Sequence, residues 1–154
     1  MLIPVSGHRI DELLVGSPDA VRVPLIGQAL CAGFPSPADD FLDGALELPR
    51  WLVPNPPATF LWRISGSSME AAGIFDRDLA CVDRSLTAGH GSVVVAAIDG
   101  QMSVKRLEVT GNVARLVFCN PDLPAFAVEE LGEGAIWGVV RFSIRWHVAR
   151  GRLS

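Results

Sequence analysis

The residues best suited to chemistry in this sequence are a serine and a lysine. Ser68 lies in the run ISGSSM, and Lys105 lies 37 positions later in the run SVKRL. Lys105 is the only lysine among 13 lysine and arginine residues. Arginine does not lose its proton in proteins, whereas a lysine buried among apolar neighbours becomes a neutral amine. A lone lysine in an arginine-rich chain therefore indicates a general base.

The surroundings of Ser68 suit a nucleophile. A strand pattern, a glycine and another serine precede it, so a tight turn would lift its hydroxyl clear of a sheet beside backbone N–H groups. The three histidines are too scattered for a Ser-His-Asp set, and serine with a lysine base is a known variant of that chemistry. By residue type alone a structural role stays open, because serines often form turns and hairpin lysines often face water.

Strand patterns surround both residues. Six candidates follow one another from residue 60: FLWRIS, DLACVD, GSVVVAAID, QMSVKRLEV, GNVARLVFC and AIWGVVRFSIRWHV. Asp99-Gly100, between the third and the fourth, is the dipeptide that a type I′ hairpin turn prefers. The pattern predicts a mainly β fold, with a strongly bent antiparallel sheet or partial barrel.

The first third of the chain differs in composition. Nine of the 11 prolines lie within residues 1–57, and proline interrupts both helices and central strands. We therefore expect a mobile N-terminal arm over residues 1–44 and a β-rich domain over residues 45–154. Within the first part, SPADDFLDG fits a short helix, and PRWLVPNPP fits a rigid, extended run.

Charge and composition exclude several classes of protein. The net charge is −4, so the chain lacks the basic surface of a nucleic-acid-binding protein. The three cysteines form no CxxC pair and the histidines do not cluster, which argues against a zinc site and a disulfide framework. Serine–lysine chemistry needs no metal and no cofactor. The N-terminal run has no signal-peptide pattern, and no apolar run is long enough to span a membrane. We expect a cytoplasmic protein.

Four linked blocks resemble the catalytic core of the self-cleaving SOS proteins, the LexA and UmuD group of serine peptidases. They read SGSSM, GIFDRDLACVD, HGSVVVAA and DGQMSVKRL. The resemblance implies the LexA-like C-terminal peptidase fold, with Ser68 as the nucleophile and Lys105 as its base. It also implies that the backbone N–H groups of Ser67 and Ser68 form the oxyanion hole. Upstream, ALCAGFPSPADDF resembles the UmuD processing segment and implies self-cleavage between Ala32 and Gly33.

The length of chain before Gly33 favours the UmuD type, because LexA repressors carry a helix-turn-helix domain there. The resemblance implies a homodimer with no direct sequence-specific DNA binding, whose cleavage is stimulated by RecA filaments on single-stranded DNA. The processed form would act with a UmuC-type polymerase in translesion synthesis, an error-prone repair pathway of the SOS response. Three alternatives stay open: a peptidase acting on other chains, a non-cleaving dimeric binding module, and a C-terminal-type fragment of a LexA-like SOS repressor.

Overall fold

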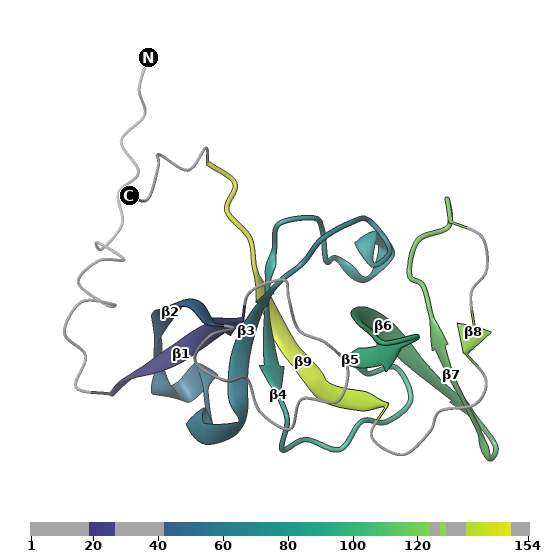
Figure 1. Cartoon of the computed structure of the whole chain (residues 1–154), viewed down its shortest axis with the longest axis horizontal. Helices are drawn as coiled ribbons and strands as arrows, with labels where there is room; N and C mark the ends of the chain where they lie inside the picture. Colours follow the sequence, from purple (N-terminus) through teal and green to yellow (C-terminus); the bar gives the residue numbers. More distant parts are fainter. Residues whose placement is uncertain (1–18, 27–41, 124–126, 129–134, 149–154) are drawn as a thin grey trace.

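The computed structural model describes residues 19–26, 42–123, 127–128 and 135–148 (Figure 1). Strands dominate these residues, and the only helices among them are short 3-10 helices at Arg50–Leu52, Pro56–Ala58 and Glu70–Ala72. The strands are β1 (Ala20–Ile26), β2 (Leu42–Pro49), β3 (Thr59–Arg63), β4 (Leu79–Asp83), β5 (Val93–Ile98), β6 (Gln101–Thr110), β7 (Val113–Val117), β8 (Ala127–Val128) and β9 (Ile136–Ile144). Within the described ranges, no helix has the length and apolar character needed to cross a membrane.

All of these strands belong to one open sheet. Their order is β2-β1-β3-β4-β9-β5-β6-β7-β8, with β2 and β8 at the two edges. Neighbouring strands run antiparallel except β1 and β3, which pair in parallel at Leu25 with Leu61 and at Ile26 with Trp62. The mainly β fold expected from the sequence is confirmed.

The sheet bends where the last strand joins its two halves. In Figure 1, β9 runs between β1–β4 on one side and β5–β8 on the other. The register of β9 shifts against β4 at Cys81/Val82 and against β5 at Val95/Ala96, and such bulges increase strand twist. At this bend a Cβ on Gly138 would lie 2.5 Å from Val82 Cγ1, so only glycine allows the close approach.

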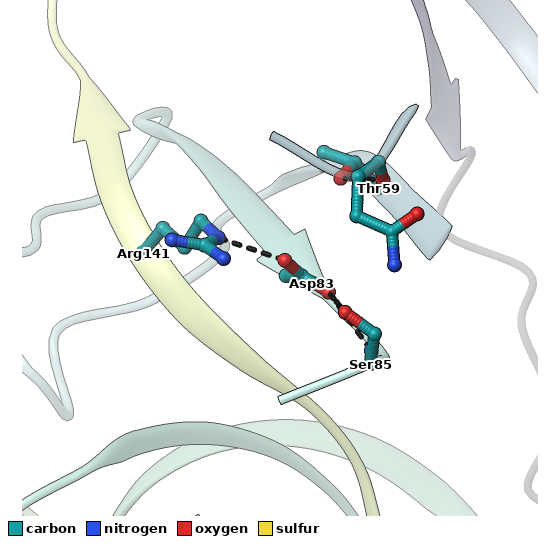
Figure 2. Close-up of polar contacts among 5 residues, drawn as sticks. Thr59, Asp83, Ser85 and Arg141 are labelled. Atoms are coloured by element: carbon teal, nitrogen blue, oxygen red, sulfur yellow. Dashed lines mark hydrogen bonds and ion pairs between the residues drawn. The ribbon is translucent and has the colours of Figure 1, made fainter. Parts of the chain in front are cut away.

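An ion pair between the buried Asp83 and the partly exposed Arg141 joins β4 to β9 near the bend. The Asp83 carboxylate has no exposed surface and accepts a hydrogen bond from Arg141 Nε at 2.8 Å. It also accepts hydrogen bonds from the backbone N–H and the hydroxyl of Ser85 (Figure 2). Burial alone would raise the pKa of Asp83, but these hydrogen bonds and the Arg141 charge hold the pKa below its usual value.

The hairpin of β5 and β6 forms as the sequence predicts. Ile98 pairs with Gln101, and the two residues between them, Asp99 and Gly100, have φ values of 49° and 78°. Two consecutive positive φ values are typical of a type I′ turn. This turn fixes the register of β6, which places Lys105 opposite Val94.

The described part of the proline-rich residues 36–57 differs from the sequence prediction. The predicted extended run over residues 49–57 is wrong, because it forms two 3-10 helices around the fully buried Val53. The helix expected over residues 36–44 lies mostly outside the described residues, and its last three residues begin β2.

Part of the expected arm belongs to the sheet. Residues 20–26 form β1, which pairs with both β2 and β3. The division of the chain after residue 44 stays a prediction.

Candidate active site

Ser68 lies in the turn that leaves β3. Gly66 has a φ of 93°, which glycine adopts without strain, and its N–H donates to Asp76 Oδ1 at 2.8 Å. The Met69 side chain that follows is 2% exposed and packs in the core cluster that also holds Ile64 and Val104. Ser68 itself is half-buried. The turn is thus anchored on both sides of the serine.

Two residues of the segment after β7 hold the carbonyl groups of this turn. Asn120 Nδ2 donates to the carbonyl oxygen of Ser67 at 2.7 Å. The N–H of Cys119 donates to the carbonyl oxygen of Ser68 at 2.8 Å. In a planar trans peptide the N–H points away from the preceding C=O, so the Ser68 N–H is directed away from Asn120.

The predicted oxyanion-hole donors are the backbone N–H groups of Ser67 and Ser68. Among the described residues, no carbonyl or side chain accepts a hydrogen bond from the N–H of Ser67 or of Ser68. Two such N–H groups beside a serine hydroxyl are able to stabilise a negatively charged oxygen. Their assignment as the oxyanion hole stays a prediction.

Lys105 lies on β6 and is only 4% exposed. Its Nζ donates to Ser103 Oγ and to the carbonyl oxygen of Val104, the latter at 3.0 Å. The ammonium group lies 4.6 Å from the centre of the Phe118 ring. In the described part of the chain no carboxylate forms an ion pair with it. Burial without a counter-charge lowers the pKa of Lys105 to about 8.

A cavity of about 230 Å³ brings the serine turn and β6 together. Ser68 and Met69 form one part of its wall, and the β6 residues Met102, Ser103 and Val104 form another. The remaining lining residues are Trp62, Arg63, Ile64 and Ser65.

Ser103 connects the lysine to this cavity. Its hydroxyl accepts the hydrogen bond from Lys105 Nζ and also lines the cavity beside Ser68. No hydrogen bond joins Ser68 directly to Lys105 in the described structure. The sequence analysis missed Ser103, although its place two residues before Lys105 puts both side chains on one face of the strand.

A larger cavity, of about 810 Å³, shares Arg63, Ile64 and Ser65 with the first. Its wall is fixed by Arg145, whose guanidinium donates to both carboxylate oxygens of Asp78, at 2.9 and 2.6 Å. The same guanidinium stacks on Phe75 at 3.8 Å from the ring centre. The hydrogen bond from Arg145 lowers the pKa of Asp78. This ion pair therefore joins Asp78, the residue before β4, to Arg145, the residue after β9.

The expected scissile bond, Ala32–Gly33, lies outside the described residues. The two flanking strands are described, and their facing ends pair with each other at Ile26 and Leu42. Ile26 is also the parallel neighbour of Trp62, which lines the smaller cavity. Ile26, the residue before the segment 27–41, therefore pairs with a residue of the cavity wall, and Leu42, the residue after the segment, pairs with Ile26.

The remaining predictions concern metal ions, cofactors and the cysteines. Among the described residues no cluster of three histidine, cysteine or acidic side chains could hold a metal ion, and the prediction that no cofactor is needed stays a prediction. Cys81 and Cys119 are free and buried.

Comparison with known proteins places the sequence among peptidases. Residues 24–141 match the family described as Peptidase S24-like. Protein MucA of Salmonella typhimurium is 44% identical over 126 residues, which cover 81% of this chain and 86% of that protein. Protein SamA of Salmonella typhimurium strain LT2 is 39% identical over 117 residues, covering 76% and 81%. The LexA repressor of Erwinia tasmaniensis is 38% identical over 128 residues, covering 80% of this chain and 62% of the repressor. The family match includes Ser68 and Lys105.

Proposed function

Because the chain belongs to the Peptidase S24-like family, we propose that it is a UmuD-like serine peptidase that cleaves its own Ala32–Gly33 bond. The family membership confirms the resemblance to the LexA and UmuD group that the sequence motifs carry. Ser68 is the nucleophile and Lys105 is its base in this proposal.

The cleavage follows the acyl-enzyme route of serine peptidases. Lys105 in its neutral form takes the proton from Ser68 Oγ while that oxygen attacks the Ala32 carbonyl carbon. The N–H groups of Ser67 and Ser68 stabilise the oxyanion that forms. The proton then passes to the departing amine of Gly33, and water hydrolyses the ester that remains on Ser68.

One observation carries the proposal: the single lysine of the chain is buried beside the cavity that the serine lines. Lys105 is held by Ser103, itself part of the cavity wall, with no acidic partner among the described residues. A surface lysine would keep a pKa near 10.4, whereas this environment brings the pKa of Lys105 to about 8. At that value a useful fraction of neutral amine exists near neutral pH.

The arrangement of β1 and β2 supports this chain's own backbone as the substrate. Ala32 follows Ile26 by six residues, which span at most about 20 Å when fully extended. Ile26 lies next to Trp62 at the cavity wall. The tether therefore keeps the bond at a high effective concentration near Ser68.

The biological setting follows from the resemblance to the UmuD group. In this proposal the protein is a cytoplasmic homodimer, and RecA filaments formed on single-stranded DNA stimulate the cut. The processed chain, residues 33–154, then acts with a UmuC-type polymerase in translesion synthesis. The similarity to the MucA and SamA proteins supports this setting.

Mass spectrometry of the purified chain tests the proposal. Incubation at alkaline pH, or near neutral pH with RecA filaments, should convert it into residues 1–32 and 33–154. Ser68→Ala and Lys105→Arg should both stay intact, since the first lacks the nucleophile and the second cannot deprotonate. Ser67→Ala is the matched control and should be cut, because its backbone N–H remains.

A further variant tests the position of the bond. Gly33→Glu should block the cut while the fold remains, because a bulky charged side chain keeps the backbone away from the serine. A wild-type chain that stays whole under both conditions would contradict the proposal and favour a non-cleaving binding module.

A further inference from the structure

Strand β1 precedes the proposed cleavage site and is inserted in the sheet. It pairs along most of its length with β2, from Ala20 opposite Pro49 to Ile26 opposite Leu42. On its other side, Leu25 and Ile26 pair with β3. The backbone N–H of Arg50 also donates to the carbonyl oxygen of Asp19, at 3.0 Å.

One face of β1 forms part of the core. Val23 is 1% exposed and Leu25 is 8% exposed, and they are two residues apart and so share a face of the strand. Val23 and Leu25 pack in a cluster with Val53 and Leu61, which lie on the carboxyl side of the proposed cut. A strand that contributes this much apolar surface does not leave a sheet easily.

Loss of β1 would also free a second strand. In the described structure β2 is an edge strand, and β1 is the only strand with which it pairs. Without β1, residues 42–49 would lose their strand partner. β3 would become an edge strand, and the apolar side chains that pack against Val23 and Leu25 would be exposed. Both conditions are unfavourable for a folded domain in water.

We propose that the amino-terminal product of cleavage stays bound after the cut, with β1 still inserted between β2 and β3. This inference rests on the proposed cleavage at Ala32–Gly33, which falls between β1 and β2 and removes none of their pairings. The cut changes β1 from a covalent part of the sheet into a separate, exchangeable strand. The space between β2 and β3 thereby becomes a strand-binding site whose occupant is the product's own segment Ala20–Ile26.

The test separates strand retention from self-cleavage. A recognition sequence for a site-specific protease is placed within residues 29–36 of a Ser68→Ala chain that carries a fluorophore at its amino terminus. The added protease makes the cut, so the result does not depend on the activity of Ser68 or Lys105. A failed self-cleavage assay and a failed retention assay are therefore distinguishable.

Size-exclusion chromatography of the cut protein in native buffer should show the fluorophore eluting with the body of the protein, and denaturing urea should separate the two. An excess of an unlabelled peptide of residues 18–32 should then replace the labelled strand slowly. The thermal midpoint of the cut complex should rise with protein concentration, as for any two-piece assembly. Elution of the fluorophore as free peptide directly after the cut would overturn the proposal.

Variants in β1 give a matched comparison. Val23→Ala should release the labelled strand roughly tenfold faster or more, because it removes buried apolar contacts. Arg22→Ala, on the exposed face of the same strand, should release it at the unchanged rate. Equal release rates for the two variants would also contradict the proposal.

Discussion

At the scale of single residues, Lys105 shows how much a residue type can reveal. The sequence marks it because arginine serves at every other basic position, and the structure places it 4% exposed and without an acidic partner among the described residues. Ser68 is marked by its neighbours, a glycine and a serine that predict a tight turn. Neither argument from type indicates how the turn around Ser68 is held.

Asn120 was missed because its role depends on a contact across 53 residues of sequence. It donates to the Ser67 carbonyl and so fixes the peptide group whose N–H is the proposed oxyanion donor at Ser68. Nothing in the local run CNPD indicates this contact. It depends on the packing of the segment after β7 against the Ser68 turn, which also places the Cys119 N–H on the Ser68 carbonyl.

This contact makes Asn120 a positioning residue with a measurable effect. Asn120→Ala should slow self-cleavage by about tenfold to a hundredfold, since loss of a direct oxyanion donor costs about a hundredfold or more. Asn120→Asp should be slower still, because it sets a negative oxygen against the Ser67 carbonyl. The pH at which the rate is half-maximal should not move in either variant.

The control for Asn120 is its neighbour Asp122, whose exposed side chain is not part of this contact. Asp122→Asn should cleave at the wild-type rate, with rates followed by gel densitometry. If Asn120→Ala cleaves normally while it remains folded, the side-chain amide of Asn120 is not needed to position the peptide group between Ser67 and Ser68.

At the scale of elements, six of the seven described strands from β3 onward were predicted, whereas β1, β2 and the two-residue strand β8 were not. Alternating apolar residues and the Asp99-Gly100 turn identify β5 and β6, and they form as expected. β1 was missed because Pro24 lies in its middle. Among the described residues, β1 pairs with β3 only through Leu25 and Ile26. The part of β1 that contains Pro24 therefore has no strand partner on that side, and proline is tolerated there.

The link between β4 and β9 gives a prediction about stability and pH. The pKa of Asp83 is lower in the folded chain than its ordinary value of 3.8, so its carboxylate stabilises the fold above that pH. Asp83→Asn should lose about 2 kcal/mol of unfolding free energy at neutral pH, because Arg141 keeps only a neutral partner. The difference from wild type should shrink as the pH falls through the folded pKa, below 3.8.

Urea unfolding followed by tryptophan fluorescence measures this difference at each pH. Glu108→Gln is the control: the residue is exposed, and exposed charges contribute little, so its stability should stay near wild type throughout. An Asp83→Asn protein that is as stable as wild type at neutral pH would mean that the ion pair between Asp83 and Arg141 does not support the junction of β4 and β9.

At the scale of the whole molecule, the sheet brings together the two strands that flank the proposed scissile bond. Both ends of the segment 27–41 are held together at Ile26 and Leu42, beside Trp62 of the cavity wall. The sequence alone gave only a long tether between Gly33 and Ser68. It could not indicate that β1 and β2 pair with each other at Ile26 and Leu42, because pairing between distant strands is not visible in local patterns.

This tether predicts cleavage within one chain. The first-order rate of self-cleavage should stay constant when the protein is diluted, because the substrate is attached to the site. A Ser68→Ala chain of distinguishable mass, mixed with wild type, should stay whole while wild type is cut. Cutting of the Ser68→Ala chain would show instead that one copy cleaves another.

The rate of self-cleavage as a function of pH tests the central claim most directly. The neutral amine of Lys105 is the active form, so the rate should rise with pH and level off above an apparent pKa of about 8. Lys105→Arg should show no cleavage at any pH, because arginine keeps its proton throughout the range. A wild-type rate that does not change from neutral to alkaline pH, or clear self-cleavage by Lys105→Arg, would contradict the assignment of Lys105 as the base.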